Sequence, residues 1–166
     1  MGKESKKEMY SYGSKRGYYR IRHTGFYNLN QIIKDLKERL ENLGYDIIDK
    51  AHEEGLSQAG KETAFEWICS KGVTDYVKFD IELKIMTAHQ VEVLVDKKKI
   101  QKGDFEFRIT SKMTKNHKES FSESKIGEIQ RHLYEKVLVK NKLEDSDDHL
   151  AEEATELINI VKENLK

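Results

Sequence analysis

The clearest pattern in the chain is a strict alternation of apolar and polar residues from Val77 to Ile85. Valine, phenylalanine, isoleucine and leucine occupy every second position, and charged residues fill the positions between them. Successive side chains of a strand point to opposite faces of a sheet. The pattern therefore predicts a strand with one buried face and one solvent-exposed face.

Shorter alternating runs on both sides predict further strands. They occupy residues 45–51, 63–69, 91–95 and 105–110, so that residues 87–90 and 97–103 are expected to be connections. A run of aromatic and basic residues at 18–22 predicts a short edge strand, whose arginines keep the free edge soluble. Because the connections are short, we expect neighbouring strands to be antiparallel.

A helix is predicted to begin after Asn28, whose side chain can cap the following amides while Gln31 completes a capping box. Gly44 tolerates the left-handed conformation at the end of such a helix. Its apolar residues recur at spacings of three and four and share one face. They are Leu29, Ile32, Ile33, Leu36, Leu40 and Leu43.

Two more helices are predicted near the C-terminus. The first has Ser120 and Glu123 as a capping box, and the second follows the acidic cap at 145–148. Both apolar faces are expected to pack against the sheet. They comprise Ile126, Ile129, Leu133, Val137 and Leu138 in the first helix, and Leu150, Ala154, Leu157, Ile158, Val161 and Leu165 in the second.

These elements predict an α+β fold: an antiparallel β-meander of about five to six strands packed with one N-terminal and two C-terminal amphipathic helices. A chain of 166 residues has the usual length of one domain. We expect a single α+β domain at residues 18–166, preceded by a basic, tyrosine-rich mobile arm at residues 1–17.

The formal net charge is +0, which implies no overall attraction to nucleic acid or anionic lipid. The charges are unevenly distributed, however. Residues 1–22 carry seven basic and two acidic side chains, whereas residues 141–166 carry three lysines and eight acids. The single cysteine, Cys69, favours a reducing compartment, and no apolar stretch approaches the roughly 18 residues that span a bilayer. We expect a cytoplasmic protein without a membrane span.

Several short motifs resemble those of a group of uncharacterised archaeal α+β proteins of unknown function. The motifs are Gly25-Phe26-Tyr27-Asn28-Leu29, Gly44-Tyr45, Tyr76-Val77-Lys78-Phe79 and Val93-Leu94-Val95-Asp96-Lys97-Lys98-Lys99-Ile100. The resemblance covers roughly residues 18–165 and implies the same fold, with no activity to carry over. This chain has Lys97 where that group favours glycine in the last motif.

Histidine is the commonest metal ligand, and two groups of residues have suitable spacing. Glu128, His132 and Glu135 fall on one side of a helix, but a polar helix stripe is usually a solvated face with a local ion pair. Acids in the second group are explained by the dipole at a helix N-terminus. That group consists of Asp147, Asp148, His149, Glu152 and Glu153. We predict no metal and no cofactor.

No catalytic motif stands out. Cys69 alternates with Phe65 and Trp67 on what is expected to be a buried strand face, where a thiolate is disfavoured. The scattered glycines form no phosphate-binding loop. We therefore expect a non-enzymatic binding or assembly module.

The N-terminal arm is the best candidate for contact with a macromolecular partner. Stacking rings interleaved with cations are typical of proteins that bind RNA or single-stranded nucleic acid. The candidate residues are Tyr10, Tyr12, Lys15, Arg16, Tyr18, Tyr19, Arg20 and Arg22. The plainer alternative is a solubilising tail followed by an edge strand. A third possibility is a homo-oligomer, in which the basic arm docks on the acidic C-terminal helix of another copy.

A curved antiparallel sheet against a long helix can also enclose an apolar cavity, as in helix-grip carriers of small molecules or lipids. The residues that would line such a pocket are Phe65, Trp67, Phe79, Phe105 and Phe107. Large aromatic residues in a sheet are more often simple core packing.

Overall fold

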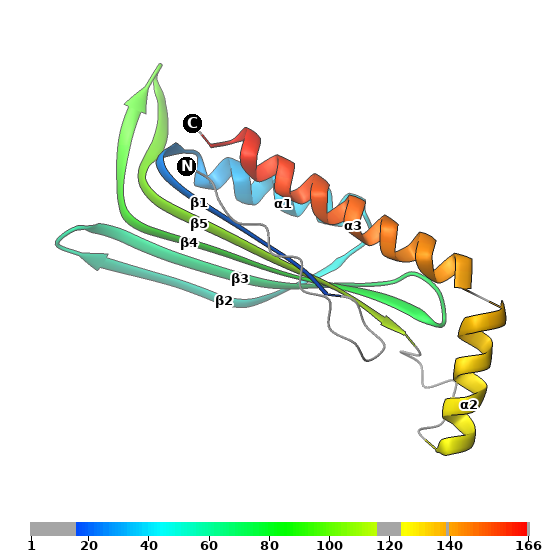
Figure 1. Cartoon of the computed structure of the whole chain (residues 1–166). Coiled ribbons are helices and arrows are strands. Elements are labelled where there is room, and N and C mark those ends of the chain that lie inside the picture. Colours follow the sequence, from blue (N-terminus) through cyan, green and yellow to red (C-terminus); the bar gives the residue numbers. More distant parts are fainter. Residues whose placement is uncertain (1–15, 116–123, 139, 166) are drawn as a thin grey trace.

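The computed structural model of this chain describes residues 16–115, 124–138 and 140–165. A five-stranded antiparallel sheet is covered on one face by two long helices (Figure 1). This arrangement, with one N-terminal and two C-terminal helices, confirms the predicted α+β class. We call the sheet face that contacts the helices the inner face, and the opposite one the outer face.

The strands run in the order β1-β5-β4-β3-β2 across the sheet. Their bounds are β1 Arg16–Tyr27, β2 Asp46–Ser57, β3 Gly60–Gly72, β4 Val77–Val95 and β5 Lys98–Lys115. Strands β2 to β5 form the predicted meander, whereas β1 pairs with the last strand, β5. The chain therefore crosses from one edge of the sheet to the other between β1 and β2, and α1 (Leu29–Asn42) makes that crossing.

Helix α1 begins as its sequence predicts. The side chain of Asn28 accepts a hydrogen bond from the backbone amide of Gln31 at 3.1 Å. Gly44 adopts a φ of 84°, which an L-residue seldom adopts, and the chain turns there into β2. Four apolar residues of α1 are buried against the sheet: Leu29, Ile32, Leu36 and Leu40.

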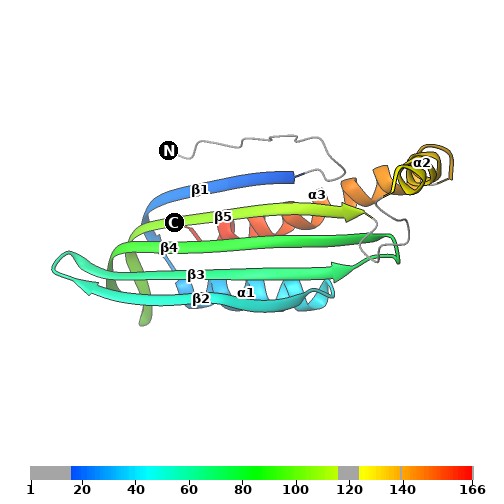
Figure 2. The ribbon, with the colours of Figure 1, turned by 90° about the horizontal axis from the view of Figure 1, so that it is seen from below.

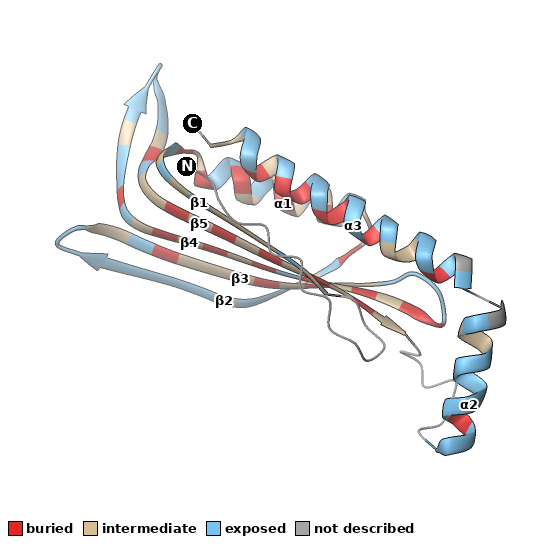
Figure 3. Cartoon of the chain, in the orientation of Figure 1, coloured by how far each residue is buried: buried red, intermediate tan, exposed pale blue. Residues whose placement is uncertain are grey.

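The core lies between the inner face of the sheet and the two helices. Buried residues recur along the strands, along α1 and along α3 (Lys140–Glu163), as Figure 3 shows. In β4 the predicted alternation is confirmed, since Val77, Phe79, Ile81, Leu83 and Ile85 are all buried. Burial of apolar side chains at this density supplies most of the stability of such a fold.

Strand β4 is longer than predicted, and residues 87–90 are not a connection. They belong to one continuous strand whose pairing with β5 is shifted by a bulge between Ala88 and Val91. His89 has a φ of 52° in this bulge. A bulge bends its strand, and beyond it β4 and β5 curve toward the helices (Figure 1).

Two glycines allow the bulge to pack closely. A Cβ atom on Gly103 would lie 2.8 Å from the carbonyl oxygen of Ala88, and one on Gly60 would lie 2.9 Å from the carbonyl carbon of His89. Real Cβ atoms essentially never approach backbone so closely. Glycine is therefore required on both neighbouring strands where β4 bends.

The connection after β4 is also shorter than predicted. Strand β5 begins at Lys98, so only Asp96 and Lys97 form the turn, and not residues 97–103. Both turn residues have positive φ, 51° for Asp96 and 64° for Lys97. These values match a two-residue type I′ turn, which forms here without glycine.

The C-terminal helices differ from the prediction. Helix α2 (Lys125–Leu133) is capped by Ser124, and the expected cap at residues 120–123 lies outside the described residues. A π-helical turn, Tyr134–Leu138, follows. Helix α3 begins at Lys140, so residues 145–148 lie inside it and do not cap it; buried Leu143 extends its apolar face by nearly two turns.

The apolar face of α2 does not pack on the sheet as predicted. Ile126, Ile129 and Leu133 are 71%, 69% and 63% exposed, and α2 stands apart from the sheet in Figure 3. By contrast, Leu150, Ala154, Leu157, Ile158 and Val161 of α3 are buried as predicted. Among the described residues, no helix has the length and apolar character needed to cross a membrane.

Candidate functional site

The outer face of the sheet is polar, and it is the face seen in Figure 2, with α1 and α3 behind the strands. In β5, Phe105, Phe107 and Ile109 are buried on the inner face, and Glu106 and Arg108 alternate with them on the outer face. The side chains of paired residues share a face. Arg22 of β1 is paired with Glu106, and Arg20 is paired with Arg108.

This pairing gathers three arginines around one carboxylate. Arg20 donates from a terminal nitrogen to Glu106 Oε2 at 2.7 Å, and Arg22 donates from Nε to the same oxygen at 2.9 Å. Arg108 donates from Nε to Glu106 Oε1. We call these four residues the arginine cluster; it carries three positive charges and one negative charge.

Glu106 is ionised at any physiological pH. Partial burial alone would raise the pKa of this carboxyl group, but the hydrogen bonds from Arg20, Arg22 and Arg108 outweigh that effect and lower the pKa to about 2. Its side chain is only 16% exposed, whereas that of Arg22 is 64% exposed. The carboxylate therefore lies below the guanidinium groups and holds them at the surface.

A second carboxylate, that of Asp104, lies next to the cluster. It is two residues before Glu106 in β5, on the side nearer the bend in β4. Asp104 accepts hydrogen bonds from His89 Nδ1 at 2.7 Å and from the Thr24 hydroxyl at 2.7 Å. The bond from His89, followed by that from Thr24, lowers the pKa of Asp104. Because His89 lies in the β4 bulge, this contact ties the bend to the outer face of β5.

An open hollow of about 730 Å³ lies over β1, β5 and β4 at this point. Six of its lining residues have outer-face side chains, so the hollow lies on the outer face. They are Arg22, Thr24, Met86, Ala88, Asp104 and Glu106. Met86 and Ala88 provide apolar surface between the charged residues, which is the kind of surface on which a planar ring can lie.

Two aromatic side chains are partly exposed on the outer face of β1. Tyr18 is 36% exposed and Phe26 is 37% exposed, one on each side of the cluster along the strand. The Lys102 ammonium lies 5.5 Å from the centre of the Phe26 ring. Aromatic residues thus flank the arginines on β1, an edge strand of the described sheet.

The structure divides the eight residues predicted to bind a partner. Tyr10, Tyr12 and Lys15 lie outside the described residues, and Arg16 is the first residue of β1. Tyr18, Arg20 and Arg22 lie together on the outer face. Tyr19 points the other way, with the Lys162 ammonium of α3 5.0 Å from its ring. The predicted edge strand is confirmed, and it is longer than residues 18–22.

The five residues predicted to line a ligand pocket belong to the core. Trp67, Phe79, Phe105 and Phe107 are at most 2% exposed. Phe65 is partly buried and stacks on His52, with the ring centres 4.3 Å apart. Cys69 is also buried, and burial raises the pKa of its thiol to about 12, so that it remains a thiol.

Several members of the two groups considered as metal ligands have other contacts. Among the described residues, no three histidine, cysteine, aspartate or glutamate side chains are placed to hold a metal ion. Glu135 accepts a hydrogen bond from the Tyr76 hydroxyl and lies 3.5 Å from the Lys115 ammonium. His149 pairs with Glu152 at 3.7 Å along the surface of α3, and Asp148 is exposed on the same helix.

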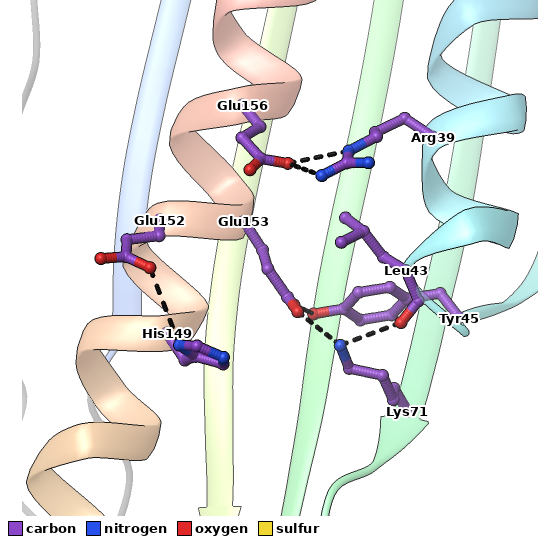
Figure 4. Close-up of polar contacts among 8 residues, drawn as sticks. All are labelled: Arg39, Leu43, Tyr45, Lys71, His149, Glu152, Glu153 and Glu156. Carbon is purple, nitrogen blue, oxygen red and sulfur yellow. Dashed lines mark hydrogen bonds and ion pairs between the residues drawn. The ribbon is translucent and has the colours of Figure 1, made fainter.

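A second polar cluster lies inside the molecule, between α1, β3 and α3 (Figure 4). Glu153 of α3 accepts hydrogen bonds from the Tyr45 hydroxyl and the Lys71 ammonium, each at 2.6 Å. The Lys71 ammonium also donates to the carbonyl oxygen of Leu43 at 3.1 Å and lies 4.5 Å from the centre of the Tyr45 ring. All polar groups of this cluster are hydrogen-bonded, so we interpret the cluster as a structural clamp that holds α3 to β3 and to the end of α1.

We call residues 124–138 and 140–165 the C-terminal segment. Near its beginning, Glu135 contacts Tyr76 and Lys115 in the same way as Glu153 contacts Tyr45 and Lys71. In both places one glutamate of that segment meets a tyrosine and a lysine of the main fold. Burial, followed by the neighbouring glutamate, raises the pKa of both Tyr45 and Tyr76. The two clamps attach the C-terminal segment to the sheet.

The sequence alone did not identify Glu106, Arg108 or Asp104 as site residues. Each lies on the polar side of an alternating strand, where charged residues are ordinary. Only the pairing of β1 with β5 brings them to Arg20 and Arg22, which lie more than 80 residues away in the sequence. The cluster of basic residues at 16–22 was the one available signal.

Comparisons of the chain with protein-family models, with curated proteins and with solved structures each returned no match. The resemblance to archaeal proteins stays a prediction.

Proposed function

We propose that this chain is a non-enzymatic binding module that contacts RNA through the outer face of β1 and β5. The observation that carries the proposal is the arginine cluster, in which Arg20, Arg22 and Arg108 share one carboxylate. The surplus of positive charge in a fixed arrangement favours an anionic partner, and arginine is the residue best suited to phosphate.

The cluster keeps donors available for such a partner. Arg22 and Arg108 contact Glu106 through Nε. Within the part of the chain that the structure describes, their terminal nitrogens donate to no protein group. A guanidinium group carries five N–H donors, so each arginine can hold Glu106 and a phosphate oxygen at once. Glu106 acts as a positioning residue for these groups.

The surroundings favour a single strand over a duplex. Exposed bases of a single strand can stack on aromatic rings, and Tyr18 and Phe26 lie at either side of the cluster. The hollow beside Arg22, with Met86 and Ala88 between charged residues, offers space for one such base. Backbone phosphates would then run along β1 across the arginines.

The experiment is a titration of the full chain with a fluorescent single-stranded RNA of mixed sequence. A variant with Arg20→Ala, Arg22→Ala and Arg108→Ala should bind at least tenfold more weakly, because phosphate contacts dominate nucleic-acid affinity. A variant with Arg→Lys at the same positions tests geometry, since lysine keeps the charge and loses the fork of donors. Circular dichroism verifies that each variant is folded.

The matched control removes three positive charges from α1, on the other side of the sheet. Lys34, Lys37 and Arg39 lie on that helix, and Lys37 and Arg39 are 43% and 40% exposed. Their combined change to alanine should leave RNA affinity within about twofold, the spread expected when only distant surface charges are lost. Equal loss of affinity in both triple variants would contradict the proposal, because it would show only non-specific charge attraction.

The N-terminal arm needs a separate test, because β1 begins at Arg16. Removal of residues 1–15 leaves the arginine cluster in place. If the truncated chain keeps its RNA affinity, the sheet face is the contact surface. If binding is lost while the arginine variants still bind, the arm is the contact and the sheet face is not.

A second candidate function is the transport of an apolar small molecule, by a single copy of the chain or by an oligomer. A groove of about 350 Å³ between β1 and α3 favours it, because Tyr19, Ile109, Ala154 and Ile158 contribute to an apolar lining. Native mass spectrometry of the purified chain would detect such a ligand. Replacing the exposed Ala151 on the rim by tryptophan should expel a ligand from this groove and leave RNA binding unchanged.

A further inference from the structure

The end of the β4–β5 hairpin, residues 91–102, extends past the end of β3, and its residues 91–100 extend past β1 as well. Pairing of β4 with β3 ends at Gln90, and pairing of β5 with β1 ends at Gln101. Figure 1 shows this part of the hairpin curving away from the β2–β3 hairpin. We call residues 91–102 the tip hairpin. The bulge at His89, pressed between Gly60 and Gly103, sets its direction.

The two strands of the tip hairpin have different chemistry. The β4 side exposes aliphatic residues: Val91 is 48% exposed, Leu94 73% and Val95 43%. Each of them is paired with a lysine of β5: Val91 with Lys102, Leu94 with Lys99, and Val95 with Lys98. Lys97 adds a fourth lysine at the turn, against Glu92 and Asp96.

The β2–β3 hairpin provides a contrast within the same molecule. Its end also exposes a leucine, since Leu56 is 88% exposed. The charged residues around it are mostly acidic, however: Glu53, Glu54 and Glu62, against Lys61. The tip hairpin therefore combines exposed aliphatic side chains with a surplus of lysine, and the other hairpin does not.

We propose that the tip hairpin docks on the surface of an anionic lipid bilayer. Leu94 and Val95 lie next to the turn, on opposite faces of the hairpin, and both enter the boundary between headgroups and acyl chains when the hairpin approaches end-on. Lys97, Lys98 and Lys99 then lie at the level of the lipid phosphates. Each lysine near such a surface strengthens binding roughly fivefold. This interaction is peripheral. Lys102 contacts the Phe26 ring of the surface proposed for RNA, and the other residues of the tip hairpin lie outside that surface.

Both the exposed aliphatic residues and the lysines of the tip hairpin favour an anionic bilayer as the partner. A nucleic acid would use the lysines but gains little from the exposed Leu94 and Val95. A second copy of the same hairpin would bring lysines against lysines, which is unfavourable. An anionic bilayer is the partner that satisfies the aliphatic residues and the lysines together.

The test is co-sedimentation of the full chain with phosphatidylcholine vesicles that do or do not contain about 30% phosphatidylserine, a content at which anionic lipid attracts polybasic segments. We expect binding only to the anionic vesicles. Leu94→Asp combined with Val95→Asp should reduce it at least tenfold, and Lys98→Glu combined with Lys99→Glu should do the same. Leu56→Asp, on the other exposed hairpin, should leave it unchanged.

Insertion can be measured separately. An environment-sensitive fluorophore can be attached selectively to a Leu94→Cys variant, because Cys69 is buried and burial raises the pKa of its thiol to about 12. We expect the emission to shift to the blue with anionic vesicles at position 94 and not at position 56 in Leu56→Cys.

Three results would overturn the proposal. The first is a lack of binding to either kind of vesicle. The second is vesicle binding that persists in the Leu94→Asp and Val95→Asp variant. The third is a loss of RNA binding in the Lys98→Glu and Lys99→Glu variant with vesicle binding unchanged, which would identify the hairpin as a nucleic-acid contact.

Discussion

Glu106 organises the outer face of the sheet although it is the one acidic residue of the arginine cluster. Without it, three guanidinium groups on neighbouring strands would repel each other. With it, the three are held within hydrogen-bonding distance of one carboxylate. The acid thus lowers the cost of concentrating positive charge on a small surface, which is the feature that the proposed function needs.

The first prediction concerns the pH dependence of this contact. The pKa of Glu106 falls from its ordinary value of 4.5 to about 2 in the folded chain. Its contribution to stability is therefore complete above about pH 4.5 and is lost as the pH falls through 2. Glu106→Gln should be less stable than the wild type at pH 7 by on the order of 1–2 kcal/mol, after allowance for solvent screening.

Urea unfolding of both proteins at several pH values provides the measurement. The difference in free energy of unfolding should shrink between about pH 5 and pH 2, the range set by the two pKa values. A difference that stays constant over that range would mean that the carboxylate is not stabilised by the arginines.

The second prediction concerns the buried clamp on α3. Lys71 and Glu153 are 18% and 11% exposed, and they pair with each other and with Tyr45. Lys71→Met alone should destabilise the fold by roughly 2–4 kcal/mol, because it leaves a carboxylate without its cation. Adding Glu153→Leu should recover part of this loss.

The matched control is the exposed pair of Arg39 and Glu156, which joins α1 to the same helix, α3 (Figure 4). Arg39→Ala should cost about 1 kcal/mol or less, as surface ion pairs do. If both changes cost the same, burial of the Lys71 and Glu153 pair has no special role in holding α3.

At the scale of elements, the bulge in β4 decides the shape of the molecule. Residues 87–90 contain no aliphatic alternation, so the sequence resembles a connection there. The strand continues because His89 takes a left-handed conformation and because Gly60 and Gly103 leave room for it. These two glycines are distant in sequence. Only the folded structure shows that both leave room for the same bulge.

The third prediction concerns the turn that closes the tip hairpin. Lys97 has a φ of 64°, a conformation that costs an L-residue about 1–2 kcal/mol relative to the right-handed region. Lys97→Gly should relieve this strain and stabilise the chain by up to about 1 kcal/mol, since Asp-Gly is a preferred type I′ pair. Thermal unfolding of the two proteins would show this; a lower midpoint in Lys97→Gly would contradict the turn geometry.

Helix α2 shows the limit of the amphipathic pattern. The spacing of Ile126, Ile129 and Leu133 predicts a helix with one apolar face, and the helix forms. The same spacing does not indicate which element covers that apolar face. In this chain the sheet does not cover it. In α3 a similar pattern does reach the core, because the Glu153 clamp and Leu143 seat the helix on the sheet.

At the scale of the whole molecule, local periodicity predicts the class of the fold and most of its core. It predicts the meander of β2 to β5, because sequential strands with short connections pair with each other. It does not predict that β1 joins β5, since that contact pairs residues 16–27 with residues 101–112, far away in the sequence. The candidate site depends on that one long-range pairing, which explains why Glu106 and Arg108 of the arginine cluster were not predicted.

The central claim is that three arginines on the outer face contact RNA phosphates, and the salt dependence of binding tests it most directly. On a plot of log affinity against log salt, each phosphate contact with a single strand contributes about −0.7 to the slope. The slope for the variant with Arg20→Ala, Arg22→Ala and Arg108→Ala should therefore be shallower than that of the wild type by about 2. The triple variant of α1 should keep the wild-type slope. Equal slopes for the wild type and the outer-face variant would contradict the account.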